Sequence, residues 1–268
     1  MKRLLLATAA IAALGLTAAQ PTLADAVSQL NGKITAGAGA VGPVDVYGGG
    51  GSIDVPLGGS WGAQGDLYAG GISGITTIGG AGHLFWRDPV DSLFGLYVSD
   101  QHFDLFGGVD VTKVGGEAEL YLSDSWTART LVGWEGGDVK DRVFDRTEVI
   151  YYPSDNWSVT AGHRYTLGIN AGVLGTTYQF AGTNFAVSLL GRIGEFRTSG
   201  AFLSLTYFFG EQGKPLAARA RQDDPVDSLS DDALSAEGSG GIGACDVGLN
   251  SAFIDHPPPG PGVKGCVD

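Results

Sequence analysis

Few residues of this chain have the types and spacing that catalysis or metal binding requires. The sequence contains no Gly-x-Ser-x-Gly, Cys-x-x-Cys, P-loop or zinc-protease motif. A glycine run at 47–51 has no helix after it, so it predicts no phosphate site. Asp100, His102, Asp104 and Asp110 gather in the longest predicted loop, where they could hold a divalent cation. Because acidic loops are more often simply solvated, we predict no metal and no cofactor.

His163 is the one residue whose position is unexpected. Its place in the alternation puts it on the same face as Trp157, Val159 and Ala161, an otherwise apolar face. No serine on the same strand is placed to pair with it. An imidazole turned inward by a β-bulge, or a neutral imidazole near an interface, is the simpler interpretation. The sequence therefore predicts no enzyme activity.

The elements that carry these residues are strands, and the clearest pair lies between residues 117 and 134. Polar and apolar residues alternate with period two on both sides of the turn at 123–125, which predicts a β-hairpin. If Leu122 faces Trp126 across the turn, Glu119 lies opposite Arg129. We expect these opposite charges to fix the register and to form a cross-strand ion pair.

The same arrangement of a short polar or Gly-rich turn, an aromatic residue and an alternating strand recurs five times. The five aromatic residues are 28 to 33 residues apart: Trp61, Phe94, Trp126, Trp157 and Phe185. This repeat predicts an all-β, up-and-down antiparallel barrel of about twelve strands. The expected strands are 30–40, 48–57, 61–72, 76–87, 93–99, 109–122, 126–135, 142–152, 157–168, 171–180, 185–193 and 199–209.

Alternation alone does not say which face of the barrel meets water. An aromatic residue at one height after each turn is typical of the girdle at a lipid–water interface. The polar face holds mixed charges and glycine, as a narrow lumen requires. Ten residues are expected to line this lumen: Asp54, Asp66, Arg87, Glu117, Glu119, Arg129, Arg146, Glu148, Arg164 and Arg192. The alternative is a soluble periplasmic β-barrel or sandwich that binds a ligand, with Trp126 and Trp157 in a dry core.

The ends of the chain differ from this body. Residues 1–26 have a basic start, an apolar core and a small-residue cleavage site, which predicts a signal peptide cut after Ala26. Residues 27–210 then form the barrel. Residues 211–268 hold four Lys/Arg and ten Asp/Glu with much Gly and Pro, which predicts a mostly disordered acidic tail and at most a solvated short helix. Its Cys245 and Cys266 are the only cysteines, and an exported protein is expected to bond them.

Taken together, the hairpin repeat and the last strand, 201–209, resemble bacterial outer-membrane β-barrel proteins. In that class a strand ending on an aromatic residue is recognised by the barrel-assembly machinery; here 59 residues follow Phe209. The resemblance implies a Gram-negative-type outer membrane, with outer-membrane lipid and the assembly machinery as partners and the tail in the periplasm. Outer-membrane acyl hydrolases place a Ser-His pair on the lipid face, so a lipid hydrolase using His163 is a further alternative.

The leading functional hypothesis is a narrow passive pore or a structural envelope protein. Twelve strands lie between filled eight-stranded barrels and water-filled porins of sixteen strands. The expected lumen has five acids and five arginines, which favours internal ion pairing over strong ion selectivity. The chain has a net charge of −13, so a nucleic-acid partner is not predicted.

Overall fold

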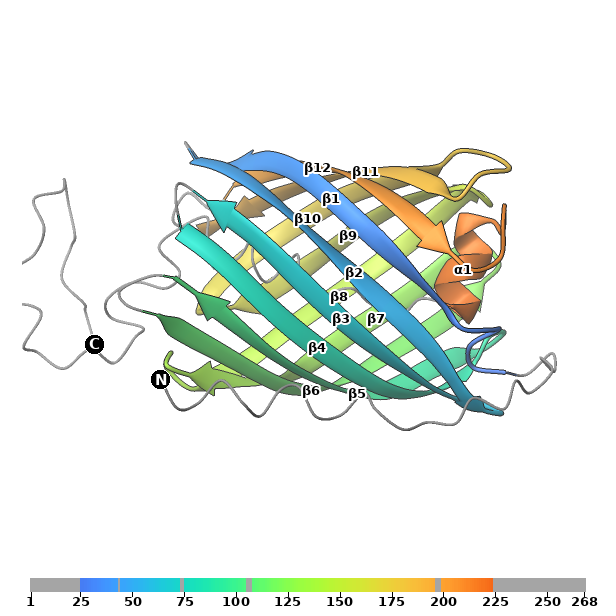
Figure 1. Ribbon diagram of the computed structural model, residues 1–268, viewed down its shortest axis with the longest axis horizontal. Coiled ribbons are helices and arrows are strands. Elements are labelled where there is room, and N and C mark those ends of the chain that lie inside the picture. Colours follow the sequence, from blue (N-terminus) through green and yellow to red (C-terminus); the bar gives the residue numbers. More distant parts are fainter. Residues whose placement is uncertain (1–24, 43, 73–74, 105–107, 196–198, 224–268) are drawn as a thin grey trace, which may run out of the picture.

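A computed structural model describes residues 25–42, 44–72, 75–104, 108–195 and 199–223. Twelve antiparallel strands form one closed barrel, and one short helix lies at one of its ends (Figure 1). The strands are β1 (Asn31–Val41), β2 (Val44–Gly58), β3 (Trp61–Ile72), β4 (Ile75–Asp88), β5 (Ser92–Phe103), β6 (Val109–Ser123), β7 (Trp126–Gly137), β8 (Arg142–Ser154), β9 (Trp157–Thr166), β10 (Ile169–Gln179), β11 (Phe185–Gly194) and β12 (Gly200–Phe209), followed by the helix α1 (Leu216–Gln222).

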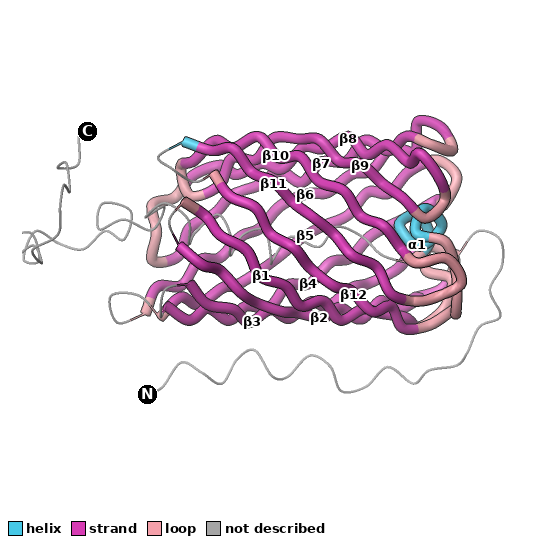
Figure 2. The backbone as a smooth tube through the Cα atoms, turned by 90° about the horizontal axis from the view of Figure 1, so that it is seen from above, coloured by secondary structure: helices cyan, strands magenta, loops and turns pink. Residues whose placement is uncertain are grey.

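Closure comes from pairing of the first strand with the last. β1 pairs with β12 from Gly32–Phe209 to Val41–Gly200, and every other strand pairs with its neighbours in sequence. The ring therefore has no edge strand with unpaired backbone groups. The tube view shows the strands running obliquely around the barrel (Figure 2). We call the end that carries α1 and the start of β1 the near mouth, and the opposite end the far mouth.

The predicted fold class, all twelve strands and the end of the last strand at Phe209 are confirmed. Most boundaries differ from the expected ones by one or two residues, and the start of β2 and the end of β5 differ by four. β5 continues to Phe103, because the alternation of buried and exposed residues continues to that point. Asp100 and His102 therefore lie on a strand and not in a loop. β9 ends at Thr166, because Leu167 and Gly168 have φ values of 53° and 77° and form a tight hairpin turn.

Two clusters of apolar side chains lie inside the barrel toward the far mouth. One cluster joins the end of β5 to the start of β6, with Val139 and Leu167 from neighbouring connections: Phe103, Val109, Val111, Val139 and Leu167. A second cluster pairs Val41 with Val46, and Phe202 packs against it. The positive φ of Leu167 is held in place because its side chain is buried here and its N–H donates to Glu135 Oε1 at 2.5 Å.

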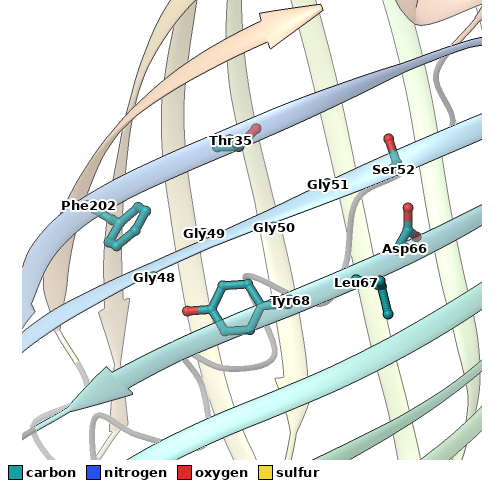
Figure 3. A pocket seen from close by; sticks show the side chains of 10 residues that line it. All are labelled: Thr35, Gly48, Gly49, Gly50, Gly51, Ser52, Asp66, Leu67, Tyr68 and Phe202. Carbon is teal, nitrogen blue, oxygen red and sulfur yellow. The ribbon is translucent and has the colours of Figure 1, made fainter.

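Glycine makes room for aromatic side chains along the inner wall of β1 to β3. Figure 3 shows Tyr68 and Phe202 beside the glycine run of β2, around a small cavity with space for little more than one water molecule. A Cβ added at Gly48 would collide with the Tyr68 ring. Gly39 is restricted by backbone, because its Cβ would collide with the Ala201 carbonyl oxygen on β12.

Gly39→Ala tests this close approach of β1 and β12. We expect it to lower the free energy of unfolding by about 1–3 kcal/mol, because a backbone atom cannot move aside as a flexible side chain can. The matched control is Gly65→Ala, whose Cβ would meet nothing within 4 Å. Denaturant unfolding in detergent measures both, and equal midpoints for the two variants would contradict the packing described.

Candidate functional site

The outer surface of the barrel is apolar and its interior is charged. Large apolar residues are exposed on every strand of the ring, among them Leu67 at 73% and Ile193 at 79%. Nine of the ten residues predicted to line the lumen are buried, and the tenth, Arg129, has a side chain only 20% exposed. Soluble proteins have the reverse distribution, with charged groups outside and apolar groups inside.

The five residues of the predicted aromatic girdle lie on the outer surface just after turns at the near mouth. Trp61 and Phe94 are 51% exposed, Phe185 is 45% exposed, and Trp126 and Trp157 are each 43% exposed. The soluble alternative placed Trp126 and Trp157 in a dry core, and that expectation is wrong. These exposures leave both indole rings accessible to the surrounding medium.

Each aromatic residue of this row also faces an aromatic residue on the strand before or after it. Trp126 lies opposite Tyr151 with ring centroids 4.6 Å apart, and Phe185 lies opposite Tyr207 at 4.8 Å. Sequence reasoning missed these partners because it considered only the residue after each turn. Tyr151 and Tyr207 lie near the end of the strand that follows each aromatic residue, in the same outward phase, and that phase identifies them.

A buried histidine joins two carboxylates on the inner wall between β3 and β6. His83 Nε2 lies 2.9 Å from Asp66 Oδ2, and His83 Nδ1 lies 2.9 Å from Glu117 Oε2. The Tyr97 ring packs against the imidazole, and Gln64 donates to Asp66. The sequence analysis named both acids and missed His83, although its inward phase on β4 was readable from the sequence.

Glu148 binds three arginines on β7, β8 and β9. Its carboxylate lies 2.5 Å from Arg129 Nε, 3.2 Å from Arg146 Nε and 2.6 Å from Arg164 Nη2. The predicted register is confirmed, since Glu119 lies directly opposite Arg129. Among the described residues, however, the ion pair of Arg129 is with Glu148 on β8, not with Glu119 on β6. Glu119 instead accepts a hydrogen bond from Tyr121 at 3.2 Å.

A third polar group ties the charged interior to the far mouth. Glu135 lies 3.4 Å from Lys113 Nζ, and Thr166 donates to the same carboxylate at 2.7 Å. Lys113 also donates to Thr166 and lies over the Phe144 ring. Lys113 and Glu135 were absent from the predicted lumen set, although both follow the same inward phase as residues that were in it.

The near mouth is closed partly by the segment that precedes β1. Ala26 and Val27 are fully buried against Phe85 and Leu93. The Ala26 N–H donates to Gly59 O at 2.9 Å, and its carbonyl accepts from Arg87 Nη1 at 3.0 Å. Residues 1–24 of the expected leader lie outside the described residues. The expected cleavage after Ala26 therefore stays a prediction.

Helix α1 closes the rest of the near mouth (Figure 1). Leu216 packs against Phe208 of β12, and the Arg221 guanidinium lies 5.2 Å from the Tyr121 ring of β6. β6 and β12 lie on opposite sides of the ring, so α1 spans the opening. The expectation of a solvated helix is wrong here: Arg219 is 2% exposed and donates to the Asn184 side chain at 3.0 Å, contacts that composition alone does not reveal.

Ser28, Lys214 and Asp223, which we call the mouth cluster, join the two segments that close the near mouth. Lys214 Nζ lies 2.7 Å from Asp223 Oδ2 and donates to Ser28 Oγ at 3.1 Å. Ser28 Oγ donates to Asp223 at 2.5 Å. Contacts with the barrel therefore continue past the expected boundary at 210, at least to Asp223. Cys245 and Cys266 lie outside the described residues.

The other candidate residues lie outside the charged interior. His163 is exposed; its Nδ1 lies 3.0 Å from Asp145 and its Nε2 lies 3.3 Å from Asn170. His102 pairs with Asp110 at 2.6 Å, and Asp100 accepts from Thr112. Within the described ranges, no three His, Cys, Asp or Glu residues are placed to hold a metal ion. No helix in the described part is long and apolar enough to cross a membrane.

Comparison with known proteins supports the fold. No protein family and no curated protein sequence matches the chain. A chain from a study of in-meso crystallization of membrane proteins has a TM-score of 0.51 and 12% identity, over 74% of this chain and 96% of that one. The KdgM porin in complex with disordered oligogalacturonate has a TM-score of 0.51 and 7% identity, over 67% and 99%.

An enzyme is also among the similar structures. The outer membrane phospholipase A from Escherichia coli has a TM-score of 0.43 and 10% identity, over 69% of this chain and 91% of that one. The barrel architecture is shared with outer-membrane β-barrel proteins such as the KdgM porin, and identities this low show the fold alone.

Glu148→Gln tests the charged interior. Removing the charge leaves Arg129, Arg146 and Arg164 without their shared carboxylate, and we expect a loss of about 3–5 kcal/mol in the free energy of unfolding, as for a broken buried ion pair. Asp124→Asn, in an exposed turn, is the control, with an expected change within about 0.5 kcal/mol. Urea unfolding in detergent compares them, and a wild-type midpoint for Glu148→Gln would refute the role of this carboxylate.

Proposed function

We propose that this chain is an outer-membrane β-barrel that acts as a narrow passive pore, closed in the described structure at its near mouth. The observation that carries the membrane placement is the apolar outer face with an aromatic row at one end. The strands have ten to fifteen residues, which is enough to cross the hydrocarbon core when tilted. A closed ring of strands also satisfies every backbone group within lipid.

The pore function is supported by the way the interior is filled. Charged groups line the middle of the barrel, and a polar interior is what a water-filled channel requires. The near mouth is closed by the two ends of the described chain and not by the wall itself. Withdrawing these segments leaves all twelve strands paired, so the barrel opens without breaking its own hydrogen bonds. Outer-membrane barrels have their short turns on the periplasmic side, so the near mouth, where the short turns lie, faces the periplasm.

The hydrolase alternative has less support. His163 contacts an acid and an amide, and among the described residues its hydrogen-bond partners include no serine. A nucleophile activated by a histidine must lie within hydrogen-bond reach of it, directly or in the substrate complex. We therefore assign His163 to the exposed polar rim of β8 to β10.

Tryptophan fluorescence tests the membrane placement. In reconstituted vesicles, lipids brominated on their acyl chains should quench the emission of Trp126 and Trp157, because both rings are exposed on the outer face. Vesicles of the same lipid without bromine are the control. A mature protein that is folded and monomeric in plain buffer, with unquenched emission, would rule out the placement.

Truncation tests the pore. A chain ending at Gly210 retains β1 to β12 and loses α1, and we expect it to fold and to conduct ions more strongly in planar bilayers than the full chain. A chain ending at Asp223 keeps α1 and the mouth cluster, and should conduct less than the shorter form. Heat-modifiable gel mobility verifies folding. Folded truncated barrels without conductance would favour a structural envelope protein.

A further inference from the structure

We propose that the lipid leaflet around the far mouth is thinner beside β5 to β9 than beside β12 and β1. Lipid head groups then bind the outer wall of β5 to β9 at a depth where the opposite wall contacts acyl chains. We call the outer face of β5 to β9 the polar side, and the outer face of β11, β12 and β1 to β3 the seam side. This inference rests on the proposed membrane placement and does not depend on conduction.

The seam side is apolar over most of the height of the barrel. On β11, Ile193 is 79% exposed, and the first charged residue in the outward phase is Glu195, ten residues after Phe185. On β2 it is Asp45, twelve residues before Leu57. β1, β3 and β12 present no charged residue outward along their described lengths. At ~3.3 Å per residue and a tilt of ~45°, the apolar height of this side is ~23 to ~28 Å, close to the usual band of ~25 Å.

The polar side becomes charged much closer to the near mouth. Asp100 lies six residues after Phe94, and His163 lies six residues after Trp157, which is ~14 Å on the same scale. His163 pairs with Asp145 on β8 at 3.0 Å, and their side chains are 49% and 31% exposed. Ionisable side chains exposed to hydrocarbon at this depth are costly. The medium at this height of the polar side is therefore polar.

The position of the far interface on this side is marked by Trp134. This residue is 43% exposed on β7, between the strands of the pair just described and those of a second pair, His102 with Asp110. Trp126 and Trp134 both face outward on β7, eight residues or ~19 Å apart. Tryptophan is enriched where lipid meets water. Two tryptophans ~19 Å apart on one strand describe an apolar band thinner than the usual ~25 Å.

Lipid head groups are the partner that this chemistry fits. The second pair is also accessible, with His102 47% and Asp110 54% exposed and their side chains 2.6 Å apart. An imidazole donates to a phosphate, and a carboxylate accepts from an ammonium group, so a histidine–acid pair can contact both parts of a zwitterionic head group. A wall whose apolar height is too small for the bilayer is accommodated by local thinning.

The near-mouth aromatic row favours local thinning over a tilt of the whole barrel. Its members lie on alternate strands from β3 to β11, each just after a turn at the near mouth. Tilting the barrel toward the polar side would move part of this row out of its interface. Thinning of the far leaflet alone leaves the row in place.

Spin labels at matched positions in reconstituted vesicles test the proposal. With Cys245→Ser and Cys266→Ser as background, Val132→Cys and Leu67→Cys each place a label six residues after a tryptophan of the row, at positions that are 48% and 73% exposed. Accessibility to a water-soluble nickel complex relative to oxygen measures the depth of each label. We expect this ratio to be several-fold higher at position 132 than at position 67.

Ala128→Cys and Ala63→Cys, two residues after the same tryptophans, are the matched controls. Their ratios should be equal, because the near interface has the same height on both sides. Equal hydrocarbon-like ratios at positions 132 and 67 would overturn the proposal and leave the membrane placement intact. Water-like ratios at all four positions would refute the placement and the proposal with it. A label at 132 that neither reagent reaches would mean that a protein, such as a second copy of this chain, covers the polar side, which also overturns the proposal.

Leucine substitutions provide a second readout. His163→Leu with Asp145→Leu, or separately His102→Leu with Asp110→Leu, extends the apolar height of the polar side. We expect either double variant to lower the ratio at position 132 toward that at 67, because hydrocarbon then covers the added leucines. Asp45→Leu on the seam side is the control and should leave the ratio at 132 unchanged. Heat-modifiable mobility verifies folding, and a ratio at 132 that neither double variant changes would overturn the role of these pairs.

Discussion

The pairing of β1 with β12 is the constraint on which the rest of the structure depends. Once these strands pair, every strand has two neighbours and the backbone has no open edge. Only then can the outer face be mostly apolar, because no backbone N–H or C=O is left without a hydrogen-bond partner there. The close approach of Gly39 to Ala201 lies within this pairing, so the absence of one side chain contributes to closing the ring.

Closing the ring also creates an interior that must be filled. Apolar clusters occupy the far mouth, ion pairs around His83 and Glu148 occupy the middle, and the segment before β1 with α1 occupies the near mouth. The charged middle is stable because its groups are neighbours in register: Glu148 lies opposite Arg129 across β7 and β8. Both charges are placed by the same alternation that places apolar residues outside.

The strands were predictable because period-two alternation and turn residues are local signals, and β3, β7 and β9 begin at the expected tryptophans. The near-mouth closure was not predictable. Arg219 and Arg221 look like residues of a solvated helix, and only the ring brings Asn184, Phe208 and Tyr121 together to receive them. The partner of Arg129 was missed for a related reason: two carboxylates face it, and sequence phase does not choose between them.

The hydrogen bond from Ser28 N–H to Gln222 O joins the segment before the first strand to the helix after the last. This bond forms only when the two segments meet. They meet only when the first and last strands of the ring lie side by side. The near-mouth closure therefore requires the pairing of β1 with β12. A barrel in which β1 and β12 are not paired lacks this closure, so the hydrogen bond between Ser28 and Gln222 reports that the ring is closed.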